Sequence, residues 1–309
     1  MTEETNDHYG KKILSDSGYD IIECRACGFA HVMPFPDKKE YSDFYENSFY
    51  QDYRSDYIKS HLDDMEWHNI EHHEKYDLFE RFLTGKDLRR ILDIGSGPGL
   101  FLKAGLARGW NTVGVEPGKD AWLYSTSELG LDVHNAFFRK ETYKNFGTFN
   151  VIHMNNVLEH LLYPKRTLTY AHEILEAGGL VCVTVPNDFN PLQEIIADYF
   201  RKEKWWVQVK AHLNYFNRES LSNLVRQAGF EIVHVTSSFP LELFVLMGDD
   251  YVGDRETGQI IHARRKNFEL AMEKSGNAEL RRDMYKKFSE LGLGRQITVL
   301  GRKNGRREC

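Results

Sequence analysis

The sequence predicts an α/β protein built on a doubly wound, mostly parallel β-sheet, and two observations support this. From residue 90 onward, short β-rich runs bounded by turn residues alternate with helical segments near residues 99–109, 119–129 and 164–177. The first run ends in a glycine-rich turn that leads directly into a helix, as in parallel sheets that hold ligands at their strand ends. The chain has 309 residues, 41% hydrophobic and 28% charged, so it can bury a full core and is neither disordered nor fibrous.

One covering helix and seven strands account for most of the hydrophobic pattern. Residues 57–84 place apolar side chains near helical spacing with charged residues between them, which predicts a helix packed over the core. Its apolar positions are Ile58, Leu62, Met65, Tyr76, Phe79 and Phe82. The predicted strands are RILDIG, NTVGVE, LDVHN, FNVIHMNN, GLVCVTVP, FEIVHVTSS and, about sixty residues after the sixth, RQITVLGRK.

Changes in periodicity divide the chain into four regions. Residues 1–56 form an N-terminal head with a CxxC pair and closely spaced tyrosines, and residues 57–238 hold the covering helix and the first six strands. Residues 239–292 form an insertion between the last two strands, whose apolar start, FPLELFVLMG, would make a lid over a binding pocket or a dimer interface. Residues 293–309 contain the last strand and a charged tail.

Charge and composition narrow the class of partner. A net charge of −6 argues against a protein built to neutralise nucleic-acid phosphates. No apolar run approaches the roughly 18 residues needed to cross a bilayer. The N-terminus lacks the apolar stretch of a signal peptide, so we expect a cytoplasmic protein, and the four cysteines imply no disulfide framework. A small-molecule partner is the expectation that remains.

The sharpest local signal is the glycine turn ILDIGSGPGLF, in which a strand ends at Asp93 and a helix follows. Its glycines are Gly95, Gly97 and Gly99, and Leu100 stands where a dinucleotide fingerprint would have its third glycine. This spacing disfavours a dehydrogenase, and the absence of a following Gly-Lys-Ser/Thr excludes a P-loop. The glycines would let the backbone approach a ligand closely.

A carboxylate at the next strand end indicates what that ligand is. Glu116 ends the strand NTVGVE, 17 residues beyond Gly99. A carboxylate at this place can accept hydrogen bonds from both hydroxyls of a ribose. The glycine turn and Glu116 together predict a ligand of the adenosine type.

These motifs resemble those of class I S-adenosylmethionine-dependent methyltransferases. The turn from Asp93 to Gly99 looks like their first motif, and residues 155–160, NNVLEH, are similar to the Leu-Glu-His signature of the ubiquinone O-methyltransferase-like group. The resemblance covers residues 88–236 and implies a seven-stranded Rossmann-like methyltransferase sheet with S-adenosyl-L-methionine as cofactor. The cofactor-binding residues that it implies are Asp93, Gly95, Ser96, Gly97, Gly99, Glu116, Pro117, Asn135, Ala136 and Asn155.

Two flanking segments also resemble parts of known methyltransferases, and they indicate the class of methyl acceptor. Residues 24–28, CRACG, followed by Pro34 and Pro36, resemble a head found on bacterial methyltransferases of sugar and natural-product pathways, and residues 212–216, HLNYF, are similar to a segment of those enzymes. The resemblance therefore implies a carbohydrate or another small pathway metabolite as acceptor. Trp205 and Trp206, which lie among lysines, would either stack on such a ring or pack within a lid.

The CxxC pair, Cys24 and Cys27, would supply half of a zinc site, which needs four ligands. In related heads a second CxxC precedes this one, but here only His8 and His31 lie nearby, so we interpret the pair as a turn that has lost its metal. No metal is expected at the Leu-Glu-His signature either, because Asn156 stands where related enzymes have the first acidic ligand.

A hydroxyl acceptor must lose its proton when it is methylated, and a histidine titrates in the right range to take it. His160 and His212 are the candidate bases, since both lie in segments expected to face the mouth of the cofactor site. The sequence thus predicts O-methylation of a sugar-containing or related intermediate. Two alternatives stay open: methylation of a nitrogen or carbon acceptor, and a non-catalytic module that binds an adenosyl ligand. A homodimer is a further expectation.

Overall fold

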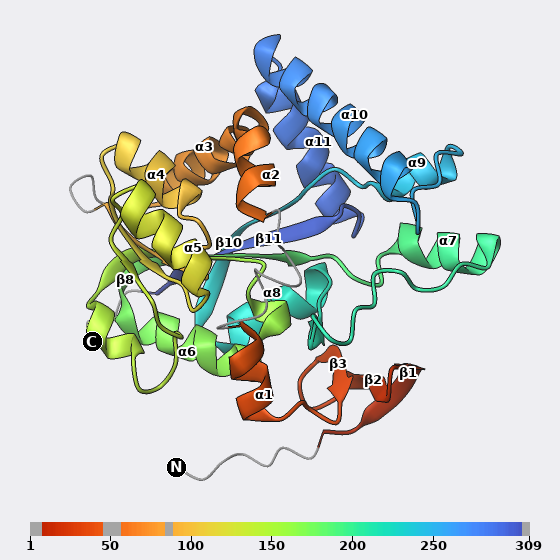
Figure 1. Cartoon of the computed structure of the whole chain (residues 1–309), viewed down its shortest axis with the longest axis horizontal. Coiled ribbons are helices and arrows are strands. Elements are labelled where there is room, and N and C mark those ends of the chain that lie inside the picture. The colour runs from red at the N-terminus through yellow and green to blue at the C-terminus, as the bar shows by residue number, and fades with distance from the viewer. Residues whose placement is uncertain (1–7, 46–56, 84–88, 305–309) are drawn as a thin grey trace.

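The computed structural model describes residues 8–45, 57–83 and 89–304. Its centre is a seven-stranded sheet with the strand order β10-β11-β8-β7-β4-β5-β6, shown in Figure 1. Strands β4 to β8 pair in parallel, and β11 is antiparallel to both of its neighbours. The predicted doubly wound sheet is therefore confirmed. The strands are β4 (Arg90–Ile94), β5 (Asn111–Val115), β6 (Val133–His134), β7 (Phe149–Asn155), β8 (Leu175–Pro186), β10 (Phe230–Ser237) and β11 (Gln296–Lys303).

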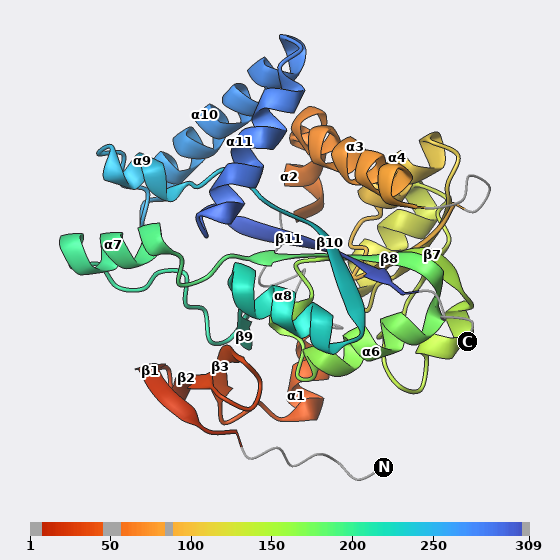
Figure 2. The same ribbon diagram turned by 180° about the vertical axis from the view of Figure 1, so that it is seen from behind.

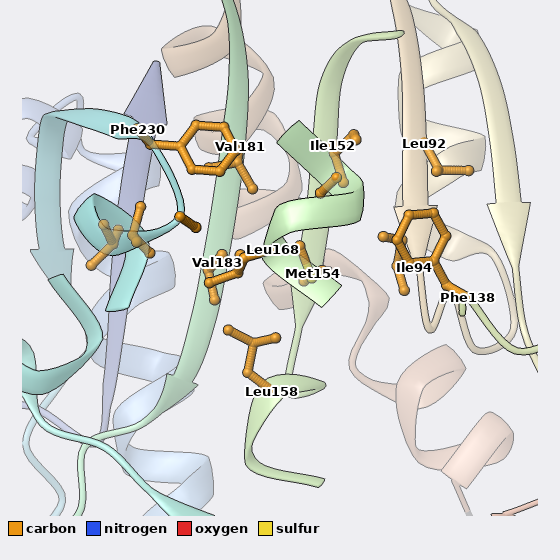
Figure 3. Packing of buried hydrophobic residues seen from close by; sticks show 14 of the residues in the cluster. Leu92, Ile94, Phe138, Ile152, Met154, Leu158, Leu168, Val181, Val183 and Phe230 are labelled. Carbon is orange, nitrogen blue, oxygen red and sulfur yellow. The ribbon is translucent and has the colours of Figure 1, made fainter. Parts of the chain in front are cut away.

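The strands read as continuous apolar runs because helices cover both faces of the sheet. Figure 3 shows Ile152 and Met154 of β7 beside Val181 and Val183 of β8, with Leu168 of α6 packed against them. On the other face, α3 and α4 bury a cluster rich in aromatic side chains. The covering helices are α3 (Met65–Phe82), α4 (Leu100–Ala107), α5 (Lys119–Leu123), α6 (Pro164–Ile174) and α8 (Arg218–Gln227).

The helix predicted over residues 57–84 is two helices, α2 (Tyr57–Asp63) and α3, which meet at Asp64. Asp64 leaves the helical range with φ −103° and ψ 17°, and its carboxylate pairs with Lys266 and His262 of the insertion. Tyr76 and Phe79 of α3 are fully buried, but Leu62 of α2 is 43% exposed. Only the second half of the predicted helix therefore covers the core.

The head is a small antiparallel sheet with the strand order β1-β2-β3-β9. Its last strand comes from residues 214–215, which lie far along the chain, so the head is hydrogen-bonded to the main body. Phe29 of β3 also contacts Phe216, with ring centroids 4.9 Å apart. The elements are β1 (Gly10–Asp16), β2 (Tyr19–Cys24), β3 (Phe29–Met33), α1 (Lys38–Asp43) and β9 (Asn214–Tyr215).

The insertion between β10 and β11 is helical and lies at the opposite end of the molecule from the head (Figures 1 and 2). Arg281 of α11 pairs with Glu74 of α3, and Ser237 of β10 donates a hydrogen bond to the carbonyl of Tyr285. Within the described ranges, no helix is long and apolar enough to cross a membrane. The remaining helices are α7 (Pro191–Phe200), α9 (Glu242–Leu246), α10 (Arg255–Lys274) and α11 (Ala278–Glu290).

Candidate active site

A cavity of about 520 Å³ opens at the carboxyl ends of β4, β5 and β7. Ligands bind at this edge of open α/β sheets because the loops that leave the strands diverge there. The glycine turn forms one part of the wall, and the ends of β5 and β7, the segment after β6, the head, α2, α3 and the insertion also contribute to it. Of the residues predicted from the sequence, the cavity is lined by Asp93, Gly95, Ser96, Glu116, Pro117, Ala136, Asn155, His160 and His212.

The glycine turn has the backbone conformation that its sequence requires. Gly97 has a φ of +52° and Gly99 a φ of +78°, a region that residues with a side chain rarely adopt. A Cβ on Gly99 would lie 2.4 Å from Leu131, so this position is closed to larger residues. Next to Gly97, the Ser96 hydroxyl is buried and has no hydrogen-bond partner among the described residues. This buried hydroxyl packs over Gly114, where a Cβ would lie 2.7 Å from it.

Glu116 connects the glycine turn to the next strand end. One carboxylate oxygen accepts a hydrogen bond from the Gly97 N–H at 2.8 Å, and the other accepts one from the Gly118 N–H at 2.7 Å. Glu116 is only 4% exposed, so these bonds fix its orientation. Each carboxylate oxygen has a second acceptor position, and the pair therefore suits the two hydroxyls of a ribose.

The side chain of Asn135, a predicted cofactor-binding residue, makes its hydrogen bonds with the backbone. Its side-chain amide donates to the backbone carbonyls of Glu116 and Pro117, both at 2.9 Å, and thereby holds the turn after β5. The neighbouring residues Ala136 and Phe137 line the cavity, whereas Asn135 is not among the described residues of the wall. Cofactor binding by Asn135 stays a prediction.

A buried polar network that the sequence analysis missed lies beneath the glycine turn. His153 of β7 stands beside Asp93 in the sheet, with His153 Nδ1 2.7 Å from the Asp93 carboxylate. Lys75 of α3 lies 3.2 Å from His153 Nε2 and 3.1 Å from the Asn155 side-chain oxygen, and it pairs with Glu71 at 2.7 Å. Burial lowers the pKa of His153, so its neutral ring donates to Asp93 and accepts from Lys75.

This network holds the ammonium group of Lys75 at the wall of the cavity. Lys75 is 5% exposed, and both Lys75 and Glu71 belong to the cavity wall. No local pattern in the sequence marks Lys75, because its role depends on how α3 crosses β7.

The two predicted histidines lie together on the wall of the cavity. His160 belongs to the turn Leu158–His160 after β7, and its ring centroid is 5.1 Å from that of His212. His160 Nδ1 lies 2.7 Å from the Ala211 carbonyl and 2.9 Å from the Tyr45 hydroxyl. Since a carbonyl can only accept, we assign the proton to Nδ1, which leaves Nε2 as the basic nitrogen.

Glu159, the middle residue of the Leu-Glu-His signature, completes this group. It is fully buried, and one carboxylate oxygen lies 3.7 Å from His160 Nε2. Among the described residues, no side chain donates a hydrogen bond to either oxygen, and the Glu159 backbone N–H favours the ionised form only weakly against burial. Burial raises the pKa of Glu159 well above its usual value, and the nearby carboxyl of Asp188 adds to the shift. Glu159 was quoted in the sequence motif but not predicted as a site residue.

These three side chains offer two kinds of chemistry. The ligand atoms of Glu159, His160 and His212 lie within 4.8 Å of one another, so the group could exchange a proton with an acceptor or hold a divalent cation. Trp205 and Trp206, for which the sequence left acceptor contact and packing within a lid both open, are not among the described residues of the wall. Trp206 is buried against Phe189 and pairs with Trp205 edge to face.

Comparison with known proteins agrees with this geometry. The model of a methyltransferase-domain family matches residues 67–235, more than half of the chain, and the chain belongs to this family. The protein is an S-adenosylmethionine-dependent methyltransferase, and S-adenosylmethionine is its cofactor. The cavity fits that cofactor, since the Glu116 carboxylate, held by the Gly97 and Gly118 N–H groups, lies on its wall beside the glycine turn.

The relatives are distant. The ubiquinone biosynthesis O-methyltransferase of Aromatoleum aromaticum (strain DSM 19018 / LMG 30748 / EbN1) is 23% identical over 193 residues, which are 59% of this chain and 79% of that protein. A SAM-dependent methyltransferase from Archaeoglobus fulgidus is 16% identical with a TM-score of 0.51, over 78% of this chain and 98% of that one. The plantazolicin methyltransferase BpumL in complex with SAH is 11% identical with a TM-score of 0.51, over 85% and 94%. The two structures are similar in fold alone.

Proposed function

We propose that this methyltransferase methylates a hydroxyl oxygen of a sugar-containing or related biosynthetic intermediate. The observation that supports this most directly is the group of Glu159, His160 and His212 on the wall of the same cavity as the glycine turn. S-adenosylmethionine supplies a methyl group on a sulfonium centre, ready for in-line attack. A hydroxyl oxygen that attacks it must lose a proton, and these side chains are placed to receive one.

The contacts of His160 suit it to act as the base. Its Nδ1–H is held by the Ala211 carbonyl and lies beside Tyr45, so Nε2 is the nitrogen left to take the acceptor proton. The raised pKa of Glu159 keeps that carboxyl protonated at higher pH than usual. Once His160 is protonated, the neighbouring carboxyl can ionise and stabilise the imidazolium. His212 lies close enough to share this role.

The walls of the cavity suit a polyhydroxylated acceptor. Tyr41, Tyr45, Tyr57 and Trp67 provide aromatic faces and hydrogen-bonding edges, and Gln208 adds an amide. Sugar rings are bound by such mixtures, because their C–H faces pack on aromatic rings while their hydroxyls find polar partners. The name of the Aromatoleum relative, an O-methyltransferase, also favours an oxygen acceptor.

The insertion belongs to the proposed acceptor pocket. Leu241 and Arg265 line the cavity, and Arg265 lies over the Trp67 ring at 4.9 Å. We therefore favour the role of residues 239–292 as an acceptor wall over the alternative of a dimer interface. Light scattering at increasing concentrations tests the dimer independently.

The proposal is tested by incubating the full chain and a metabolite extract with methyl-labelled S-adenosylmethionine, followed by mass spectrometry. The expected product gains one labelled methyl group on an oxygen that becomes resistant to acetylation. A methylated nitrogen or carbon would replace the O-methylation proposal. Tight cofactor binding without any labelled product would favour the non-catalytic module.

Variants then test the base. His160→Ala and His212→Ala are compared with His134→Ala, whose side chain lies at the exposed end of β6. Loss of the true base should lower kcat by roughly 10²- to 10⁴-fold and leave the affinity for S-adenosylhomocysteine unchanged. If both variants keep most of their activity, the base lies elsewhere or alignment alone suffices. Activity that is lost in EDTA and restored by a divalent cation would assign Glu159, His160 and His212 to a metal instead.

A further inference from the structure

Four metal-binding side chains meet in the head, and none of them lines the methyl-transfer cavity. Cys24 ends β2, Cys27 lies in the turn between β2 and β3, His31 lies on β3, and His8 lies two residues before β1. Their ligand atoms all lie within 4.8 Å of one another. His8 and His31 are the histidines that lie nearby in the sequence, but the sequence does not predict that they lie beside the cysteines and complete a ligand set with them. The fold of the head brings them there.

The distances between these atoms match a tetrahedral site. With Zn–S bonds of about 2.3 Å and Zn–N bonds of about 2.05 Å, tetrahedral ligands are separated by about 3.3 Å for N···N and about 3.6 Å for S···N. In the structure, His8 Nδ1 is 3.1 Å from His31 Nε2, 3.4 Å from Cys27 Sγ and 3.8 Å from Cys24 Sγ. Small rotations of the side chains would therefore place all four around one ion.

The surroundings of the ligands are also those of a metal site. His31 is fully buried, and its Nδ1 lies 3.0 Å from the Val32 carbonyl, which holds the proton on Nδ1 and leaves the Nε2 lone pair facing His8 and the cysteines. Metal-bound histidines commonly have such a carbonyl partner, because it fixes both the ring and its tautomer. The Gly28 N–H bonds to the Cys24 carbonyl at 2.9 Å, which closes the turn that carries both thiols.

We propose that the head binds one Zn²⁺ ion through His8, Cys24, Cys27 and His31. Two thiolates balance the charge of the ion, and the mixture of sulfur and imidazole donors selects zinc over magnesium or calcium. Four protein ligands leave no position open for substrate, so the site is structural. The histidines replace the second cysteine pair whose absence from the sequence argued against a metal.

The ion would stabilise an element with little core of its own. The apolar cluster beneath the head sheet is small, and part of it comes from residues 207–215 of the main body. A metal that joins β1, β2 and β3 fixes the strand that pairs with β9, since Ala30 and His31 are the residues opposite Tyr215 and Asn214. Zinc binding is thus expected to raise the stability of the head and of its junction with the main body.

The test uses the full chain, expressed with zinc in the medium and purified without chelators. Elemental analysis and native mass spectrometry are expected to find one zinc per chain. His8→Ala, Cys24→Ser, Cys27→Ser and His31→Ala should each lose it. Cys182→Ser, which changes a buried thiol of β8 outside the cluster, is the matched control and should keep it.

Two further measurements distinguish the loss of a zinc ligand from the misfolding of a variant. Binding of S-adenosylhomocysteine, whose predicted contacts all lie outside the head, shows which variants remain folded. The cobalt-substituted wild-type chain is expected to show the thiolate-to-cobalt charge transfer and intense visible bands of tetrahedral S₂N₂ coordination. A wild-type chain that contains no zinc and binds no cobalt would overturn the proposal. A folded His8→Ala or His31→Ala variant with full zinc content would overturn the four-ligand site.

Discussion

Replacement of Glu116 by Gln tests the cofactor site with the smallest change in shape. The carboxylate accepts hydrogen bonds from the N–H groups of Gly97 and Gly118 at 2.8 and 2.7 Å. Glutamine keeps one acceptor oxygen and turns the other into a donor. We expect Glu116→Gln to weaken binding of S-adenosylhomocysteine and to lower the melting temperature of the free protein.

The magnitude follows from the bonds that are lost. When a ribose hydroxyl loses its charged acceptor, the binding free energy weakens by about 1.5–3 kcal/mol, which corresponds to a roughly 10- to 150-fold increase in Kd. One backbone N–H is left facing an amide donor, and this costs about 1–3 kcal/mol of folding stability. The two effects are measured separately, by calorimetry with the ligand and by thermal unfolding without it.

Glu128→Gln is the control, because Glu128 is exposed after α5 and should change neither quantity. The reasoning about the ribose is refuted if Glu116→Gln lowers the melting temperature but leaves Kd within twofold of the wild type. Glu116 would then only hold the glycine turn in place.

Three further changes test other parts of the molecule. Gly97→Val should give a folded chain, judged by circular dichroism, with no calorimetric binding of S-adenosylhomocysteine, because valine disfavours a φ of +52°; near-normal affinity would contradict the role of the turn. Arg265→Gln should raise the acceptor KM several-fold without changing cofactor affinity, and an unchanged KM would remove the insertion from the acceptor pocket. Burial raises the pKa of Asp188 to about 7, so the folded state binds this proton more tightly than the unfolded state does. Asp188→Asn should therefore gain stability relative to the wild type as the pH rises from 4 to 7, measured by urea unfolding; a pH-independent difference would contradict the shift.

The fold and the cofactor half of the site could be predicted because their signals are local. Asp93, Gly97 and Glu116 lie in short motifs in which strand, turn and ligand contact follow within a few residues. Parallel strands place such motifs at one edge of a sheet whatever the rest of the chain does. The region around Asp64 shows the limit, since an apolar pattern compatible with one long helix does not reveal a break that ion pairs with a distant helix stabilise.

The features that sequence reasoning missed depend on contacts between distant segments. Lys75 reaches His153 only because α3 crosses β7, and His8 meets His31 only because β1, β2 and β3 pair in a particular register. Neither contact can be predicted from the spacing of these residues along the chain. Glu159 differs, because it lies inside a motif already quoted, and what the sequence could not supply was its complete burial.

The pairing of β3 with β9 also bears on how this enzyme could be recombined with its relatives. Residues 214–215 are a strand of the head sheet, although they follow the whole cofactor-binding half in the chain. His212 lies two residues before that strand, and the Leu213 carbonyl accepts a hydrogen bond from the Val32 N–H. A chimera cut only near residue 56 would join a foreign head to a native β9 and disturb the acceptor side of the cavity. The exchangeable unit is discontinuous and comprises the head together with residues 207–216.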